Sequence, residues 1–310
     1  MICQAMIDVD IHNENNGVKY MKKIEQTAFQ IQQNRQLFRC PICQENIVLE
    51  DKTVICAKGH RFDLAKKGYV NFLMQASPND YTKVLFEARH QIIQSGMYDR
   101  LHQVIAEEMG KFQNQSTVSV LDIGCGEGSH LAQIVSRLKR LDTVGVGVDI
   151  SKDGITTAAK YYPEFLWAVG DLAKSPFQTK QFDILLNILS PANYQEFDRL
   201  LHDDGIVIKV VPRSKYLKEI RELVLDKSKQ TYQNTEAMDT FHQHYAQVKS
   251  IEVQYEWSVP ESLRTSLLKM TPLTWNKISE NKMSELAENL HVITVDLQVL
   301  VGRNSDMGGV

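Results

Sequence analysis

Short apolar runs alternate with amphipathic stretches along most of the chain after residue 110. Apolar runs of this length, separated by helix-length patterns, predict parallel strands joined by crossover helices. The sequence therefore predicts an α/β fold, with a doubly wound, largely parallel sheet of about seven strands and helices on both faces. The expected strands lie at 117–123, 144–149, 165–171, 182–187, 205–211, 251–257 and 291–301.

The first expected strand ends in a glycine-rich turn. Gly124, Gly126 and Gly128 alternate with other residues, and an expected helix begins at Ser129. Glycine accepts positive φ angles and lets a ligand approach the backbone closely, so these four positions are candidate cofactor contacts. A dinucleotide-binding turn would carry its third glycine at position 129, where this chain has serine. The turn therefore favours a bulky cofactor that lacks a pyrophosphate.

Carboxylates stand at the ends of three successive expected strands. Asp122 precedes the glycine turn, Asp149 ends the second strand and Asp171 ends the third. A carboxylate can accept both hydroxyls of a ribose, which makes Asp149 the expected ribose ligand. Asp171, between Gly170 and Leu172, is placed to accept a hydrogen bond from an adenine amino group. Each aspartate alone could instead cap a helix. Their repetition beside the glycine turn favours a cofactor site over three separate caps.

The stretch 81–109 has helical periodicity and is expected to bridge two parts of the chain or to cover the edge of the cofactor site. Arg89 and His90 lie within it, beside Lys83. Two interpretations of Arg89 and His90 are open. They could contact a phosphate or a cofactor carboxylate, or they could form a solvated helix face, which is the commoner role of such residues.

Two short pairs of metal-ligand residues precede this stretch. Cys40 and Cys43 form a Cys-x-x-Cys pair, and Cys56 and His60 form a Cys-x-x-x-His pair. Three thiolates and one imidazole complete a tetrahedral shell with no open position, so the sequence predicts one structural zinc. The chain has five cysteines, an odd number, and its opening residues lack the pattern of a secretory signal. We therefore expect free thiols in a reducing compartment.

Length and composition predict two domains. The chain has 310 residues, of which 43% are hydrophobic, and no stretch of the sequence approaches a membrane span. Residues 1–33 are rich in Asn and Gln and are expected to be flexible or partly helical, and residues 304–310 to form a loose tail. The expected divisions are 1–33 as an extension, 34–77 as a zinc-binding module, 78–110 as a helical linker, 111–303 as the main domain and 304–310 as a tail.

Charge is distributed unevenly along the chain. The formal net charge is −3, yet residues 35–73 hold seven basic and four acidic side chains. This excess predicts that the zinc module faces a polyanion, although a solvated charged surface is the ordinary alternative. The candidate polyanion contacts are Lys58, Arg61, Lys66 and Lys67.

With the glycine turn and its acidic strand ends, the chain resembles the class I S-adenosylmethionine-dependent methyltransferases. The motif around the second metal pair, Cys-x-x-x-His-Arg-Phe-Asp-Leu-Ala-Lys-Lys-Gly-Tyr-Val-Asn, narrows the resemblance. Together with Cys-Pro-Ile-Cys, Ser190-Pro-Ala-Asn-Tyr194 and Met270-Thr-Pro-Leu273, it is similar to the RlmA (RrmA) type of 23S rRNA (guanine-N1)-methyltransferase. The resemblance spans about residues 38–302. It implies a Rossmann-like sheet, S-adenosylmethionine as cofactor, 23S rRNA as partner and a cytoplasmic location.

That resemblance implies methyl transfer to N1 of a guanine in a 23S rRNA hairpin, with the zinc module binding RNA. Asn187 ends the fourth expected strand, where the methyl group would be delivered, and is both the candidate catalytic residue and a candidate cofactor contact. Amino-methylating enzymes often carry Asn/Asp-Pro-Pro-Tyr/Phe at this position. This chain reads Asn187-Ile-Leu-Ser-Pro, which leaves room for a ring nitrogen as the target. Asn187 could equally cap the following turn.

The general base that removes the N1 proton is not identified by the sequence, nor is the formation of a homodimer. Trp257, Met270, Thr271, Pro272 and Trp275 lie in or beside an insertion at 258–289 and could stack an extruded base, or simply pack in the core.

Two other functions are compatible with the same residues. The chain could methylate a small molecule, with a purely structural zinc module, or it could be a non-catalytic cofactor-binding module that recruits RNA or protein partners. Uptake of labelled methyl by rRNA would separate all three functions.

Overall fold

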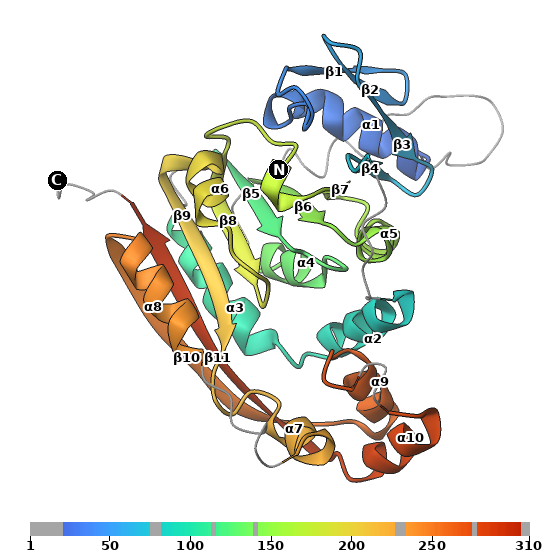
Figure 1. Cartoon of the computed structure of the whole chain (residues 1–310), viewed down its shortest axis with the longest axis vertical. Helices are drawn as coiled ribbons and strands as arrows, with labels where there is room; N and C mark the ends of the chain where they lie inside the picture. The colour runs from blue at the N-terminus through green and yellow to red at the C-terminus, as the bar shows by residue number, and fades with distance from the viewer. Residues whose placement is uncertain are drawn as a thin grey trace.

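The computed structural model describes residues 21–74, 82–112, 116–138, 142–226, 234–274 and 278–304. Its strands form one sheet in the order β1-β2-β3-β4-β7-β6-β5-β8-β9-β11-β10 (Figure 1). The seven strands from β7 to β10 in this order correspond to the seven predicted from the apolar runs. They are β5 (Thr117–Ile123), β6 (Asp142–Asp149), β7 (Leu166–Val169), β8 (Phe182–Ile188), β9 (Leu201–Pro212), β10 (Gln247–Ser258) and β11 (Val292–Arg303).

The centre of the sheet is parallel and its far edge is antiparallel. Strands β7, β6, β5, β8 and β9 run parallel, whereas β11 pairs antiparallel with both β9 and β10. From β5 the chain first adds β6 and β7 on one side of this strand and then β8 and β9 on its other side. This change of side beside β5 is the topological switch point, next to which such sheets bind ligands. The helices between the strands are α4 (Ser129–Val135), α5 (Lys152–Tyr161), α6 (Tyr194–Leu200), α7 (Lys218–Val224) and α8 (Thr235–His244).

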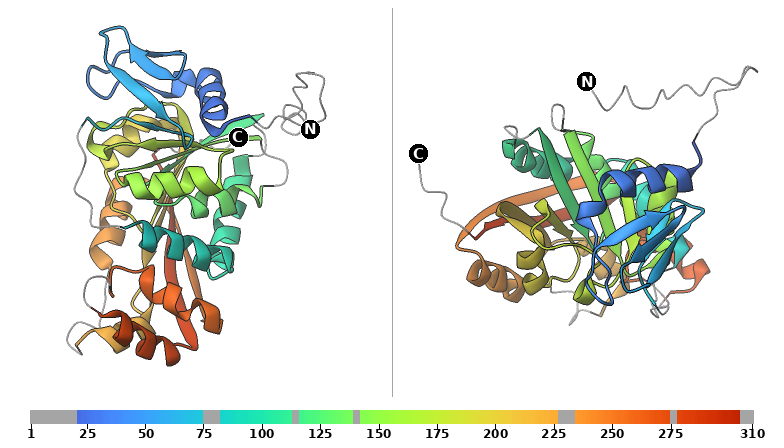
Figure 2. Two further views of the ribbon diagram at one scale, coloured as in Figure 1. Left: turned by 90° about the vertical axis from the view of Figure 1, so that its right-hand side faces the viewer. Right: turned by 90° about the horizontal axis from the view of Figure 1, so that it is seen from above.

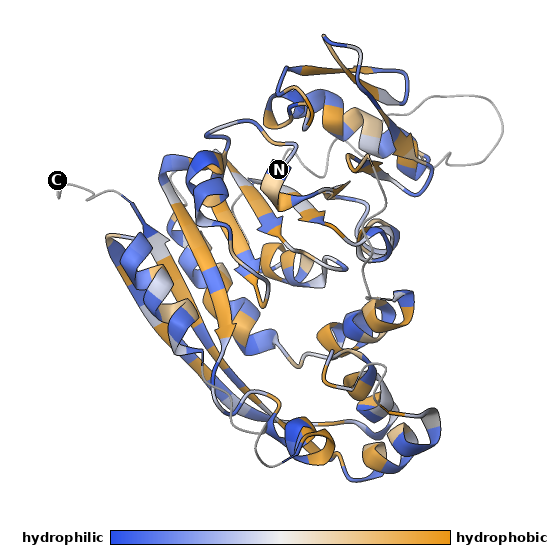
Figure 3. Cartoon of the chain, viewed as in Figure 1, coloured by the Kyte–Doolittle hydropathy of each residue, from blue (hydrophilic) through white to orange (hydrophobic). Residues whose placement is uncertain are grey.

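Both faces of the sheet are buried. Alternate residues of β5 enter two different apolar clusters, Val118 and Val120 in one and Leu121 and Ile123 in the other. Successive side chains of a strand point to opposite faces of the sheet. Because both faces are buried here, the strand must be apolar at nearly every position. Figure 3 accordingly shows the central strands coloured mainly as hydrophobic. The expected class of fold, an α/β sheet covered on both faces, is confirmed.

The N-terminal module, residues 23–74, adds four strands to this sheet. It contains α1 (Lys23–Gln33), β1 (Ile47–Glu50), β2 (Thr53–Cys56), β3 (Arg61–Ala65) and β4 (Tyr69–Asn71). Strand β4 pairs in parallel with β7, through Val70 opposite Ala168 and Asn71 opposite Val169. The count of about seven strands therefore holds for the large domain (residues 116–304), whereas the complete sheet has eleven. These extra strands are too short to show a clear apolar period.

The end of the N-terminal extension is helical, which was one of its two expected states. Residues 23–33, included in a segment expected to be flexible or partly helical, form α1, with Thr27 and Ile31 buried. The ammonium of Lys23 donates to the carbonyl oxygens of Ala159 at 2.8 Å and Lys160 at 2.6 Å, at the end of α5. Helix α1 thus belongs to the module and joins it to the large domain. The expectation for residues 1–20 lies outside the described residues.

The linker and the insertion form the other end of the molecule. Helices α2 (Lys83–Gln94) and α3 (Asp99–Met109) precede β5, and α9 (Arg264–Lys269) and α10 (Glu280–Glu288) lie between β10 and β11. Helix α2 packs between α5 and α9. Figure 2 (left) shows the N-terminal module, α5, α2 and the α9–α10 pair stacked in that order. Trp275 lies outside the described residues. Within them, no helix combines the length and apolarity needed to cross a bilayer.

Candidate active-site cleft and metal centre

A cleft of about 900 Å³ opens at the carboxyl ends of the parallel strands. Its size lies in the upper part of the range for ligand pockets, about 300–1,000 Å³. Helix α2 and the insertion supply its other wall, through Phe86, Arg89 and Met270. Of the candidate cofactor residues, the cleft is lined by Gly124, Asp149, Gly170, Asp171 and Leu172. Sequence positions far apart therefore converge on one site.

The glycine turn approaches its neighbours too closely for side chains. Gly124, Gly126 and Gly128 have φ values of 73°, 57° and 76°, in the left-handed region. A β-carbon on Gly124 would lie 2.0 Å from Oγ of Ser190, and one on Gly128 would lie 2.3 Å from the ring of Trp167. The glycine turn thus packs in close contact with the loop after β8 on one side and with the buried core on the other. Gly126 and Gly128 are not among the residues that line the cleft.

Asp149 supports the turn and also faces the cleft. Its Oδ2 accepts from the Gly126 N–H at 2.9 Å, and its Oδ1 accepts from the Ser151 N–H at 2.7 Å. Burial raises the pKa of Asp149, while these two N–H groups act to lower it. A carboxylate oxygen can accept more than one hydrogen bond, so lone pairs remain for a ligand. Ser151, and not Asp149, caps α5, so the helix-cap alternative does not apply to Asp149.

Asp171 combines a cap with a place in the cleft. Its Oδ1 accepts from the Ala173 N–H at 2.9 Å, at the start of the short helix Leu172–Lys174. The side chain is partly exposed, and Gly170 and Leu172 line the cleft on either side of it. The two interpretations of Asp171 are therefore compatible, because one carboxylate oxygen caps the turn and the other is available to a ligand.

Asp122 lies beneath the glycine turn and does not line the cleft. It is buried, and its Oδ2 has no hydrogen-bond partner among the described residues. Burial raises the pKa of Asp122 to about 8, and the nearby carboxylates of Asp149 and Glu127 add to the rise. Glu127 is also buried, but it reaches the cleft. Glu127 was not among the candidates, although its position inside the glycine turn could have suggested it.

Arg89 comes from α2 and lies over the glycine turn. A β-carbon on Gly126 would lie 3.3 Å from Nη1 of Arg89, and its Nη2 donates to the carbonyl oxygen of Met270 at 3.4 Å. Burial raises the pKa of Glu127, and the positive charge of Arg89 opposes this rise. The interpretation of Arg89 as part of a solvated helix face is therefore wrong, because its guanidinium lines the cleft.

Ser129 and His90 form a hydrogen-bonded group behind the turn. Oγ of Ser129 lies 3.2 Å from Nδ1 of His90 and 2.9 Å from the hydroxyl of Tyr162. Ser129 is fully buried and is not among the residues that line the cleft. Its geometry favours a role in packing α4 against α2. Lys83, at the start of α2, is exposed to solvent.

Asn187 is buried at the end of β8, below the floor of the cleft. Its Nδ2 donates to the carbonyl oxygens of Ile123 at 3.2 Å and Pro191 at 3.0 Å, and its Oδ1 accepts from Nζ of Lys209 at 2.6 Å. The side chain thus ties together the ends of β5, β8 and β9. This geometry favours the alternative in which Asn187 holds the following turn. Direct contact of Asn187 with cofactor or base remains a prediction.

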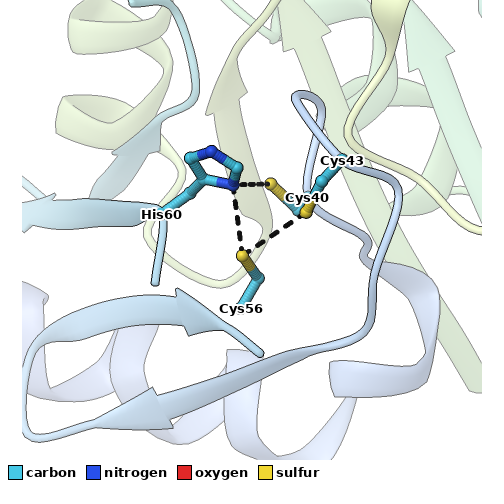
Figure 4. A group of neighbouring side chains, drawn as sticks. All are labelled: Cys40, Cys43, Cys56 and His60. Carbon is cyan, nitrogen blue, oxygen red and sulfur yellow. Dashed lines mark hydrogen bonds between the residues drawn. The ribbon is translucent and has the colours of Figure 1, made fainter. Parts of the chain in front are cut away.

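The metal ligands converge as the spacing predicts. The ligand atoms of Cys40, Cys43, Cys56 and His60 all lie within 4.8 Å of one another (Figure 4). Nδ1 of His60 is 3.5 Å from Sγ of Cys40 and 3.4 Å from Sγ of Cys56, and the sulfurs of Cys43 and Cys56 are 3.5 Å apart. Tetrahedral zinc bonds place neighbouring ligand atoms about 3.5–3.8 Å apart. The geometry and the donor set therefore fit zinc.

Two tight turns bring the ligands together. The N–H of Gln44 donates to the Cys40 carbonyl, and the N–H of Gly59 donates to the Cys56 carbonyl, each at 2.8 Å. Gln44 and Gly59 both have positive φ angles. The four ligands hold the loop before β1 against the β2–β3 turn, so the metal would staple a module with few strand residues.

The four candidate RNA contacts are exposed but do not form one cluster. Lys58 and Arg61 lie at the β2–β3 turn, where Lys58 pairs with Glu45 at 3.4 Å. Lys66 and Lys67 lie in the β3–β4 turn, beyond the opposite end of β3. At about 3.3 Å per strand residue, the two pairs are separated by about 15 Å. The basic excess is therefore spread along one strand of the module.

Comparison with known proteins agrees with both parts of the structure. Residues 38–75 match a zinc-ribbon family model described as "RlmA, N-terminal", and residues 120–205 match a model described as "Methyltransferase domain". A Bacillus subtilis protein described as a candidate 23S rRNA (guanine-N(1)-)-methyltransferase is 42% identical over 273 residues, covering 86% of this chain and 96% of that protein.

More distant proteins match as well. The 23S rRNA (guanine(748)-N(1))-methyltransferase of Streptomyces fradiae is 26% identical over 271 residues, with 86% of this chain and 96% of that protein covered. Among solved structures, the Haemonchus contortus phosphoethanolamine N-methyltransferase 2 in complex with S-adenosyl-L-methionine is 16% identical, with a TM-score of 0.46, covering 73% of this chain and 58% of that chain.

Proposed function

Because the chain belongs to the family of 23S rRNA (guanine-N1)-methyltransferases, we propose that it transfers the methyl group of S-adenosylmethionine to N1 of a guanine in 23S rRNA. The observation that carries this proposal is the joining of two sites in one sheet. The cleft lies at the carboxyl ends of the parallel strands, and the zinc module extends the same sheet beside β7. The module and the cleft therefore belong to one continuous sheet, which supports a single RNA substrate that contacts both.

The cleft offers complementary groups for each part of the methyl donor. Asp149 and Asp171 line the cleft. In this proposal Asp149 accepts the ribose hydroxyls, and Asp171 accepts from the adenine amino group. Arg89 supplies a positive charge over the glycine turn for the donor's carboxylate. Glu127 supplies a buried carboxylate nearby for its ammonium. The donor brings an electrophilic methyl group on a sulfonium, and these residues orient it.

A guanine must leave any base pair before its N1 can be methylated, because N1 lies on the pairing edge. The remaining volume of the cleft is bordered by Tyr194, Tyr216 and Met270. Aromatic and apolar side chains of this kind can stack an extruded base. Ordinary core packing also applies to Met270, which is buried on its other side. We propose that this half of the cleft receives the guanine.

The N-terminal module would bind the RNA backbone. Its basic side chains are exposed, and Lys66 and Lys67 lie in the turn just before β4, the strand that pairs with β7. Phosphate contacts of this type supply affinity without reading sequence. Location in the cytoplasm follows from the same proposal, because ribosomal RNA is the substrate. Assembly into a homodimer remains a prediction.

One experiment separates this function from its alternatives. Purified protein is incubated with labelled S-adenosylmethionine and 23S rRNA from a strain lacking the gene, and the product is mapped by primer extension. Methylation of guanine N1 blocks pairing, so we expect label in the rRNA and a single strong stop at one guanine. Label in small molecules alone would favour the small-molecule methyltransferase. Cofactor binding without any transfer would favour the recruitment module.

A further inference from the structure

Lys209 is a lysine in the middle of the sheet that reaches the cleft. It lies on β9, only 4% of its surface is exposed, and it borders the cleft. Its Nζ donates to Oδ1 of Asn187 at 2.6 Å and to the carbonyl oxygen of Ser190 at 3.1 Å. Both acceptors belong to the end of β8 and the loop that follows, where the methyl group is to be delivered.

The surroundings of this amine suit its neutral form. Two acceptors satisfy the two N–H bonds of a neutral amine and leave its lone pair unused. No carboxylate forms an ion pair with Lys209 in the part of the chain that the structure describes. Burial lowers the pKa of Lys209 to about 8, so a substantial fraction is neutral near physiological pH. A general base works best when its pKa lies near the working pH.

The loop around the amine is held in a fixed shape. Leu189 has a φ of 54°, a left-handed conformation that is uncommon for a branched residue. Its N–H donates to the Val210 carbonyl at 3.1 Å, and the amide of Asn187 holds the Pro191 carbonyl at 3.0 Å. This arrangement turns the Ser190 carbonyl toward Lys209. Asn187 thus acts as a positioning residue for the amine.

The other titratable groups near Lys209 are poorer proton acceptors. The residues level with it on β8 and β11 are Asn187 and Leu300, which do not titrate. Burial lowers the pKa of His130 to about 3 and raises that of Tyr194, so neither accepts a proton readily at neutral pH. The titratable groups that share the cleft with Lys209 are Arg89, Tyr98, Cys125, Glu127, His130, Asp149, Asp171, Tyr194, Tyr216 and Glu236. Burial raises the pKa of the Cys125 thiol, so this thiol stays protonated at neutral pH, and Glu236 lies exposed on α8.

Geometry also separates the cleft's carboxylates and tyrosines from this role. Tyr98 and Tyr216 bond each other through their hydroxyls at 2.6 Å. Asp149 and Asp171 accept backbone N–H groups at the nucleoside end of the cleft. Glu127 belongs to the glycine turn, beneath Arg89. Among the described residues that line the cleft, Lys209 is the titratable group that donates hydrogen bonds to Asn187 and to the loop after β8.

From this placement we infer that Lys209 is the general base that accepts the N1 proton of the target guanine, an inference that rests on the proposed function. The N1–H bond breaks and its proton passes to the lone pair of Nζ. The electron pair left on N1 forms the new bond to the methyl carbon. The pair of the sulfur–methyl bond stays on sulfur, giving S-adenosylhomocysteine. The ammonium of Lys209 then returns its proton to water.

The test compares single-turnover methylation of 23S rRNA by the wild type and by Lys209→Met and Lys209→Arg variants. Arginine keeps the positive charge and the donors but cannot accept a proton in this pH range. We expect both variants to lose about 100-fold or more in rate, the usual contribution of a general base. The affinities for S-adenosylmethionine and for RNA, measured by calorimetry and filter binding, should change by less than about threefold. Lys249→Met, at an exposed lysine on β10, is the matched control and should keep its rate.

The pH profile supplies a readout that a structural role would not move. A base must be neutral, so the wild-type rate should rise with pH and level off above about 8. A folded Lys209→Arg variant with the wild-type rate would overturn the inference, since charge alone would then suffice. A wild-type rate that stays flat, or falls, as pH rises to about 9 would overturn it as well. Failure of the wild type to methylate 23S rRNA would instead refute the proposed function.

Discussion

Phe38 of the N-terminal module and Phe177 of the large domain are joined by a backbone bridge, and their ring centroids lie 5.4 Å apart. Phe72 also stacks on Phe38, and Phe182 contacts Phe177 edge-on. All four rings belong to one apolar cluster that spans both parts. The zinc module is therefore not tethered by a linker alone. Its core continues into the core beneath the sheet.

This shared core predicts that the two parts unfold together. Phe177→Ala leaves a cavity in a site with no exposed surface and should cost about 3–5 kcal/mol. We expect one cooperative thermal transition that shifts downward, together with easier loss of zinc to a chelator. Calorimetry and zinc release measure the two effects. The idea fails if zinc retention is unchanged and two separate transitions appear, and Leu223→Ala, at a partly exposed residue of α7, serves as the control.

The metal site predicts one zinc per chain. Cys40→Ser combined with Cys43→Ser removes two of four ligands and should abolish binding, because the remaining pair cannot complete a tetrahedron. Elemental analysis of protein purified without chelator measures the zinc content. Cys125→Ser alters a buried cysteine outside the cluster and should retain the metal. Less than half an equivalent in the wild type, or full zinc in the double variant, would contradict the assignment.

Asp149 is expected to hold the donor ribose. Asp149→Ala should weaken S-adenosylmethionine binding by about 1.5–3 kcal/mol through loss of charge-assisted hydrogen bonds. Part of this loss arises from the glycine turn, since Gly126 would lose its acceptor. Calorimetry gives the dissociation constant. Asp142→Ala changes an exposed aspartate at the opposite end of the same strand and should have no effect, whereas an unchanged constant in folded Asp149→Ala removes Asp149 from the site.

The buried acid beneath the turn predicts a pH-dependent affinity. The pKa of Asp122 is about 8 in the free protein. The sulfonium and ammonium of the donor favour the charged carboxylate, so binding should lower this pKa and release a fraction of a proton. Affinity should therefore increase as pH rises toward 8.

Proton release is measured by calorimetry in buffers of different ionisation enthalpy. S-adenosylhomocysteine lacks the sulfonium charge, so its binding should release fewer protons than the binding of S-adenosylmethionine. Asp122→Asn cannot titrate and should lose the effect. Equal proton release by the wild type and by Asp122→Asn would show that another group is responsible.

The basic side chains of the module predict the salt dependence of RNA binding. Neutralising Lys58, Arg61, Lys66 and Lys67 should weaken binding and reduce the log–log salt slope by roughly 0.7–0.9 for each phosphate that is no longer neutralised. The pair Lys58 and Arg61 and the pair Lys66 and Lys67 lie at opposite ends of β3. Neutralising either pair alone should therefore give part of the reduction in the salt slope. Cofactor affinity should stay the same.

The measurement is the affinity for an rRNA fragment over a series of salt concentrations. Lys249→Gln with Lys282→Gln neutralises two exposed lysines of the large domain and provides the control. Circular dichroism and zinc content verify that the variants are folded. A quadruple variant with the parent slope would favour a purely structural module and a small-molecule substrate.

The sequence alone determined the features that depend on neighbouring residues. The metal ligands form two local pairs, and each pair needs only one tight turn to present both of its side chains. The glycine turn and the aspartates at the strand ends follow the same logic, because the carboxyl ends of parallel strands meet at one edge of a sheet. The apolar runs indicated seven strands, since a strand buried on both faces is apolar throughout.

Only the tertiary structure decided which distant residues meet. The register of β8 against β9 places Asn187 beside Lys209, and no local pattern encodes this register. Arg89 reaches the glycine turn because α2 packs against α5 and α9, although its helix pattern equally suited a solvated face. The module joins the sheet through β4, which pairs with β7, and through the separate bridge between Phe38 and Phe177. Local sequence thus predicts which groups are available, whereas packing between distant segments decides what each group contacts.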